Sequence, residues 1–280
     1  IRDTSRSRGL GDVYKRQLLG FFGAFMVGLI LGLIGSGGSI LSVPILVYLF
    51  GINPVTATAY SLFIVGTTSL IGSIKNLRDK LINYSSTLLF SFSAVITVYL
   101  TRKYLIHLIP ETIINSELLY LSKDQLIMLL FSLLMLTAGF LMIKRTPKTI
   151  IGLKQTKTIA PNKLLIFAEG SLIGFLTGLI GAGGGFIIIP ILVILSDLRM
   201  KIAIATSLAI ISLKSLIGFL GDVQNLEIDW LFLLSFTVIS VIGIFTGQMF
   251  SQNVPENKLK TVFGLFVIFI GLLILLIEFS

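Results

Sequence analysis

The sequence predicts an all-α integral membrane protein that is built from two homologous halves. Three observations indicate this class: long apolar runs, little charge and an internal repeat. Of the 280 residues, 55% are hydrophobic and 12% are charged, whereas a typical soluble domain has about 25% charged residues. Lipid offers the backbone no hydrogen-bond partner, so a chain that crosses it must form helices or a closed barrel.

Helices rather than barrel strands are expected from the apolar runs. Barrel strands alternate polar and apolar residues, and runs such as residues 264–279 do not. Two further apolar runs, residues 40–50 and 186–195, are too short to span comfortably. The runs close to the ~20 residues that a spanning helix needs are 18–34, 56–74, 84–100, 125–143, 164–180, 202–220, 229–250 and 259–279.

An internal duplication relates the two halves of the chain. Residues 28–72 align with residues 174–218 without a gap, and 21 of the 45 aligned positions are identical. Apolar composition alone would not align glycines and prolines. The aligned pairs include Gly32, Gly35, Gly37, Gly38 and Pro44 with Gly178, Gly181, Gly183, Gly184 and Pro190. We therefore predict a first transmembrane repeat over residues 18–143 and a second over residues 164–280.

The segments outside the repeats carry much of the charge. Residues 144–163 contain six Lys or Arg and no acidic residue, which predicts a basic cytoplasmic linker by the positive-inside rule. Residues 1–17 do not fit the rest, and we expect a non-native or disordered leader. The net charge of +9 is interpreted as the same bias rather than as nucleic-acid binding. The chain has no cysteine, which excludes disulfides and thiolate chemistry.

Two glycine clusters, residues 35–39 and 181–185, lie between apolar runs at hydrophobic depth. Each glycine inside a helix costs about 1 kcal/mol relative to alanine, so we expect both helices to break there. A break leaves amides open to a ligand, and the new helix start favours an anion. Paired breaks in two halves are typical of a transporter's midplane site. The alternative is that the glycines only allow close helix packing.

These motifs resemble the TauE/SafE family of sulfite and organosulfonate transporters. The resemblance rests on GLIGSGGSILSVP and GLIGAGGGFIIIP, followed by the Ala-Thr-Ser-Leu step at residues 205–208. It covers residues 18–280 and implies a transporter of sulfite, sulfonates or related small anions in the cytoplasmic membrane of a bacterium or archaeon. The first half departs from the pattern at Ser39 and at residues 59–61, so we expect the two half-sites to differ.

Polar residues inside the apolar runs are the remaining candidates. Lys214 lies near the centre of its run and aligns with Thr68; it supplies one positive charge to an anion site or snorkels toward Asp222. Glu169 takes a coupling proton or caps the interface. The hydroxyls of serine and threonine residues in these runs, such as Ser61, Thr68 and Ser207, either donate hydrogen bonds to the anion or bond a backbone carbonyl of their own helix. The expected substrate-binding residues are Gly37, Gly38, Ser39, Ser61, Thr68, Gly183, Gly184, Gly185, Ser207 and Lys214.

The expected function is therefore secondary transport of a small anion across the cell membrane. The alternative is a transporter or channel for another small solute, such as a cation or a metabolite. We expect no cofactor, no metal and no enzymatic activity, because no catalytic motif is present. The expected partners are the anion and membrane lipids, with a homo-oligomer left open.

Topology follows from the basic loops. If each half contributes five helical segments, Lys75, Lys201 and Lys258 fall in the cytoplasm and the acidic turn 222–229 falls outside. Eight spans would reverse several of these placements. The positive-inside rule therefore favours ten segments, and an odd number of crossings per half inverts the second repeat.

Overall fold

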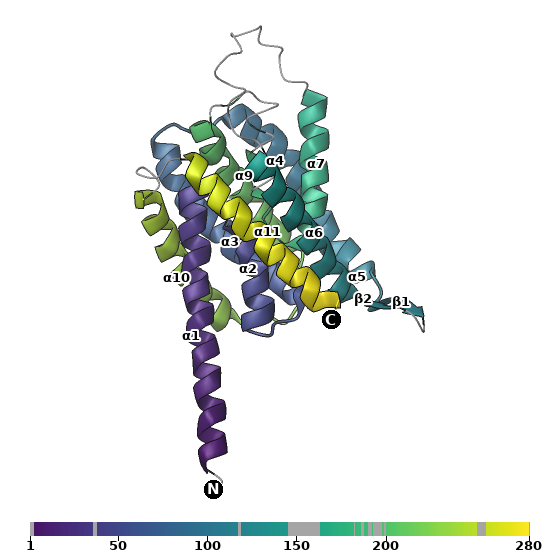
Figure 1. The fold of residues 1–280 in the computed structure, drawn as a ribbon. Helices are drawn as coiled ribbons and strands as arrows, with labels where there is room; N and C mark the ends of the chain where they lie inside the picture. Colours follow the sequence, from purple (N-terminus) through teal and green to yellow (C-terminus); the bar gives the residue numbers. More distant parts are fainter. Residues whose placement is uncertain are drawn as a thin grey trace.

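The computed structural model of this protein is a bundle of helices packed side by side (Figure 1). It describes residues 3–35, 38–116, 119–144, 163–181, 183–185, 188–189, 192, 198, 200–250 and 256–279. In Figure 1 the N-terminal part of α1 projects beyond the bundle, and the small hairpin of β1 and β2 projects from its lower side.

Each half contributes long helices and, next to its glycine cluster, a break. The first half contains α1 (Asp3–Ile34), α2 (Ser39–Pro44), the π-helical segment η1 (Ile45–Leu49), α3 (Pro54–Arg78), α4 (Tyr84–Leu100), the π-helical segment η2 (Thr101–Leu105), α5 (Ile106–Leu108), β1 (Thr112–Ser116), β2 (Leu119–Ser122) and α6 (Lys123–Lys144). The second half contains α7 (Lys163–Ile180), α9 (Met200–Leu220), α10 (Trp230–Phe250) and α11 (Glu256–Phe279).

Several of these helices are suited to a membrane by length and composition. Within the described ranges, the segments long and apolar enough to cross are Pro54–Arg78, Thr87–Leu108, Lys123–Phe140, Ile202–Leu220 and Trp230–Phe250. Shorter apolar helices are Leu18–Ile34, Ser39–Leu49, Ile166–Ile180 and Gly264–Phe279. The expectation of a multi-pass membrane protein is thereby confirmed.

Both glycine clusters interrupt their helices, as predicted. Helix α1 ends at Ile34 and is followed by Gly35 with φ +85°, and α7 ends at Ile180 and is followed by Gly181 with φ +69°. Side chains other than glycine rarely adopt this left-handed conformation. The chain therefore leaves both helices at matched positions inside the bundle.

The two halves contact each other through matched helices. Helix α1 packs on α10, as α7 packs on α4, while α3 packs on α9 and α6 on α11. Gly170 lies against Phe90, and Gly178 lies against Thr101, so α4 and α7 run parallel. By the same test α1 and α10 are parallel, since Gly28 lies against Ser240 and Gly32 against Gly247.

The other two helix pairs run antiparallel. Gly139 of α6 lies against Gly264 of α11, whereas Gly271 lies against Met135. For α3 and α9, Gly66 lies against Leu216 and Gly218 against Leu62. Each of these two pairs joins helices that occupy the same place in the two halves, so matched helices point in opposite directions.

These directions sort the helix ends onto two faces of the bundle. One face, called the basic face, holds the ends of α3, α6 and α10 and the starts of α4, α7, α9 and α11, with exposed Lys75, Arg78 and Lys80. The opposite face, called the hairpin face, holds β1, β2, the chain's C-terminus and the turn 221–229 between α9 and α10 (Figure 1). That turn contains Asp222, Glu227 and Asp229 and no Lys or Arg.

Three features differ from expectation or extend it. The antiparallel β1–β2 hairpin was not predicted, because this part of the chain lies outside the apolar runs. Helix α4 continues through η2 and α5 to Leu108, beyond residue 100, where the apolar run ends. Residues 3–17 are helical and continuous with α1, while a non-native origin for residues 1–17 stays a prediction.

Close helix packing yields a first prediction at Gly247. A Cβ at Gly247 would overlap the carbonyl oxygen of Leu29 across the α1–α10 contact. Since backbone must move to make room, Gly247→Ala should destabilise the protein by about 1–3 kcal/mol. Thermal unfolding in detergent measures the change, with the exposed Met249→Leu as control. An unchanged unfolding temperature for Gly247→Ala would contradict this packing.

Candidate functional site

The two glycine clusters meet inside the bundle. A Cβ placed on Gly183 would lie 3.1 Å from the Cβ of Ser39. The hydroxyl of Ser61 donates a hydrogen bond to the carbonyl oxygen of Gly181 (2.7 Å) and is also hydrogen-bonded to the hydroxyl of Ser42. Ser39, Ser42 and Ser61 are fully buried. Residues of α2 and α3 in the first half therefore contact the break of the second half directly.

Lys214 extends from α9 into the same region. Its side chain is 0% exposed, and its Nζ donates to the hydroxyl of Thr177 on α7 (2.7 Å). A Cβ placed on Gly184 would lie 3.0 Å from this Nζ. Among the residues that the structure describes, no carboxylate lies within 4.0 Å of Nζ. Lys214 is therefore a buried cation beside the glycine break, and it does not reach Asp222.

The glycines themselves divide into two kinds. Gly183 and Gly184 have φ values of +63° and +64°, so the backbone there is left-handed over two successive residues. Gly38 has a right-handed φ of −65°, and a Cβ there would overlap Val27 and Leu31 of α1. The packing interpretation therefore accounts for Gly38. Gly185 is buried and helical, and Gly37 lies outside the described residues.

The other expected site residues are placed less centrally. The hydroxyl of Thr68 donates to the carbonyl of Ile64 (2.6 Å), and that of Ser207 to the carbonyl of Ile204 (2.8 Å), so both bond their own helices. Glu169 is on α7, about two turns before Thr177, and its Oε2 is buried without a hydrogen-bond partner. Within the described part of the chain, no ion pair joins Glu169 to Lys214.

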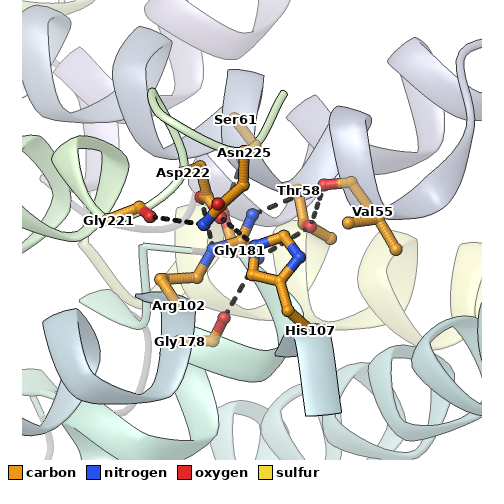
Figure 2. Close-up of polar contacts among 10 residues, drawn as sticks. All are labelled: Val55, Thr58, Ser61, Arg102, His107, Gly178, Gly181, Gly221, Asp222 and Asn225. Carbon is orange, nitrogen blue, oxygen red and sulfur yellow. Dashed lines mark hydrogen bonds and ion pairs between the residues drawn. The ribbon is translucent and has the colours of Figure 1, made fainter. Parts of the chain in front are cut away.

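A second buried cation, Arg102, was missed by the sequence analysis. It lies in η2 and is fully buried, as is Asp222, and its Nε donates to Asp222 Oδ2 at 2.5 Å. Figure 2 shows the guanidinium between Asp222, Thr58 and Gly178. Arg102 was missed because the apolar run ends at residue 100, whereas the helix continues beyond that residue with Arg102 facing inward.

The two cations hold the last turn of α7 from different helices. Lys214 bonds the hydroxyl of Thr177, and Arg102 Nη1 bonds the carbonyl oxygen of Gly178 at 3.2 Å. A helix C-terminus carries a partial negative charge, which stabilises nearby cations. Because Gly181 ends this helix in the interior, the dipole lies where solvent does not screen it.

Within the described ranges, no group of three or more His, Asp or Glu residues could hold a metal ion. A pocket of about 220 Å³ is lined by Phe50, Ile52, Tyr60, Asp229 and Phe232 on the hairpin face. It is largely aromatic and does not include Lys214.

The chain is similar to proteins that are named as probable membrane transporters. The chain is 29% identical over 253 residues to a probable membrane transporter protein of Xylella fastidiosa (strain 9a5c), covering 89% of this chain and 91% of the relative. It is 26% identical to the probable membrane transporter protein YunE of Bacillus subtilis (strain 168), with 88% and 94% covered. The probable membrane transporter protein MJ0441 of Methanocaldococcus jannaschii is also 26% identical, with 88% and 91% covered.

The family whose description is sulfite exporter TauE/SafE matches residues 20–274. No solved structure matches the chain significantly. The relatives are named as transporters, which is consistent with the expectation that the chain is not an enzyme. With the match running across both halves and both glycine clusters, the chain belongs to the TauE/SafE family of membrane transporters.

Proposed function

We propose that this transporter carries a small oxyanion, such as sulfite or a sulfonate, through the region where the two glycine clusters meet. The observation that carries the proposal is the buried ammonium of Lys214, which has a hydroxyl but no carboxylate within ion-pair distance among the described residues. An ammonium taken out of water needs compensation by an opposite charge or strong hydrogen bonds. An anionic substrate supplies that charge when it binds.

The groups around Lys214 suit an oxyanion. The hydroxyls of Ser42, Ser61 and Thr177 are buried in this region and donate to the carbonyl oxygens of Ser39, Gly181 and Ile173. Each hydroxyl can donate to an anionic oxygen when it releases its carbonyl. Gly184 adds no side chain of its own beside Nζ, and the methyl group of Thr177 fills the space that a Cβ would take there. The aligned position in the first half is Thr68, so this part of the site carries one positive charge. One charge attracts an anion while still allowing it to leave, whereas a cationic substrate would be repelled.

Alternating access is the mechanism that we infer from the arrangement of the halves. The antiparallel pairs α3–α9 and α6–α11 support an inverted repeat, because matched helices point in opposite directions. The placement of Lys75 and Arg78 on one face and of the acidic turn on the other supports ten segments with a cytoplasmic basic face. In an inverted repeat, exchanging the conformations of the two halves converts an inward-open state into an outward-open one.

Neutralising Lys214 tests the anion site. Lys214→Met keeps the apolar stem and removes the charge, so the affinity for labelled sulfite in proteoliposomes should fall at least about tenfold, as expected for a lost hydrogen bond to a charged group. Lys75→Met on the exposed end of α3 is the matched control and should leave the affinity unchanged. Equal affinities for the two variants would overturn the role of Lys214.

Single-cysteine labelling tests the topology. The chain is naturally free of cysteine, so one cysteine can be introduced at the exposed Asn225 of the hairpin face or at the exposed Asp79 of the basic face. An impermeant thiol reagent should label Asn225→Cys in intact cells and should label Asp79→Cys only after the membrane is opened. Protection of Asn225→Cys in intact cells, together with labelling of Asp79→Cys, would refute the proposed orientation.

A further inference from the structure

A buried carboxylate oxygen on the hairpin face has no hydrogen-bond partner. Asp222 follows α9, and its side chain is 0% exposed. Its Oδ2 accepts a hydrogen bond from Arg102, but its Oδ1 accepts no hydrogen bond. Ionised carboxylate oxygens are strong acceptors, and leaving one unsatisfied in the interior is unfavourable. A proton on Oδ1 removes the charge and so reduces the unfavourable burial.

A route for such a proton leads through His107. The Nε2 of His107 lies 4.0 Å from Asp222 Oδ1, and the His107 side chain is 30% exposed. Figure 2 shows the imidazole beside the Arg102–Asp222 pair. Histidine exchanges protons near neutral pH. The orphan oxygen is therefore one side chain away from the outside of the described bundle.

Arg102 does not depend on an ionised Asp222 for all of its hydrogen bonds. Its guanidinium also donates to Thr58 Oγ1 (2.9 Å), to the carbonyl of Gly178 (3.2 Å) and to that of Val55 (3.4 Å). If Asp222 takes up a proton, these three acceptors still hold the guanidinium in place. The pair can thus change its total charge without leaving a donor wholly unpaired.

The matched positions in the other half carry neutral residues in place of this ion pair. At the repeat offset, Arg102 corresponds to Gln248 and Asp222 to Asn76. Gln248 lies toward the basic face and donates from Nε2 to the carbonyl of Gly72 at 2.9 Å. Two amides occupy the places that a cation and an acid occupy on the hairpin face. The charged pair is therefore an addition to one side of the transporter.

We propose that Asp222 binds the coupling proton of this transporter and receives it from the hairpin face through His107. This rests on the proposed anion transport and names its coupling ion. An ionised Asp222 would oppose an anion near α7, and protonation removes that repulsion. Arg102 and Lys214 bond the neighbouring residues Gly178 and Thr177, so the two sites share the last turn of α7. Proton and anion should bind cooperatively, which predicts symport.

The groups that face Asp222 agree with a protonatable acid. Burial raises the pKa of the Asp222 carboxyl, while the charges of Arg102 and His107 act to lower it. Lys123, at the start of α6, is a further charged group whose field reaches His107. Its Nζ lies 3.9 Å from Oε1 of Glu111. Stability from a carboxyl with a raised pKa is present at low pH and declines as pH rises through that pKa. Acidification should therefore load Asp222 without unfolding the protein.

The first test reads the proton directly on purified protein. Infrared difference spectra between acidic and neutral pH should show a protonated carboxyl band that is absent in Asp222→Asn. Asp229→Asn, which lies in the same turn, should retain the band. If Asp222→Asn retains the same band, Asp222 binds no proton and the proposal is overturned, whether or not the protein transports anions.

The second test uses proteoliposomes and labelled methanesulfonate, a strong-acid anion that stays ionised near neutral pH. In wild type, an inward proton gradient should drive accumulation above the level reached by counterflow. In Asp222→Asn this gain should disappear, while Asp229→Asn keeps it. Accumulation in Asp222→Asn equal to wild type would refute coupling through Asp222. Absence of counterflow in wild type would instead refute transport of this anion, and the infrared result would still decide proton binding.

A second variant serves as a control in case Asp222→Asn does not fold. Asp222→Asn leaves Arg102 charged and buried, so the double variant Arg102→Gln, Asp222→Asn places the neutral residues of the other half on both positions. If the single variant does not fold, the double variant takes its place in both measurements. It should lack the carboxyl band and the gradient-driven gain. Proton-driven accumulation in the double variant would overturn the proposal.

Discussion

Helix α7 must end inside an apolar bundle, and the rest of the site depends on how that end is satisfied. Gly181 stops the helix with a left-handed residue, which leaves carbonyl groups and the negative end of the dipole away from water. Ser61 bonds the carbonyl of Gly181 from α3, and Arg102 bonds that of Gly178 from η2. A break that lipid could not tolerate is thus stabilised by side chains from the other half.

The two halves share an arrangement of helices but differ in charge, so the proposed site is asymmetric. Lys214 corresponds to Thr68, and its partner Thr177 corresponds to Leu31, which is buried in an apolar cluster with Leu208 and Ile244. The cation beside the break therefore belongs to the second half alone. The proposed repeat accounts for the shared arrangement of helices, and the polar residues found in one half alone carry the chemistry that we propose.

The sequence predicted the features that depend on local composition. Glycine density predicted the breaks at Gly35 and Gly181, and the repeat predicted which segments correspond. It could not predict Arg102 or Asp222 as a pair, because 120 residues separate them and only tertiary packing joins η2 to the turn after α9. Nor could it separate Gly38, which permits close packing, from Gly184, which has a left-handed backbone, since both occur in matched motifs.

The central claim is that an oxyanion binds at the ammonium of Lys214, and locating a heavy anion in the protein tests it most directly. Selenite resembles sulfite and scatters anomalously, so a crystal soaked in it reports the anion's position. The account predicts an anomalous peak within hydrogen-bond distance of Lys214 Nζ, beside Gly184, that is lost in Lys214→Met. A peak elsewhere in the bundle with none at Lys214, or a peak unchanged in Lys214→Met, would contradict it.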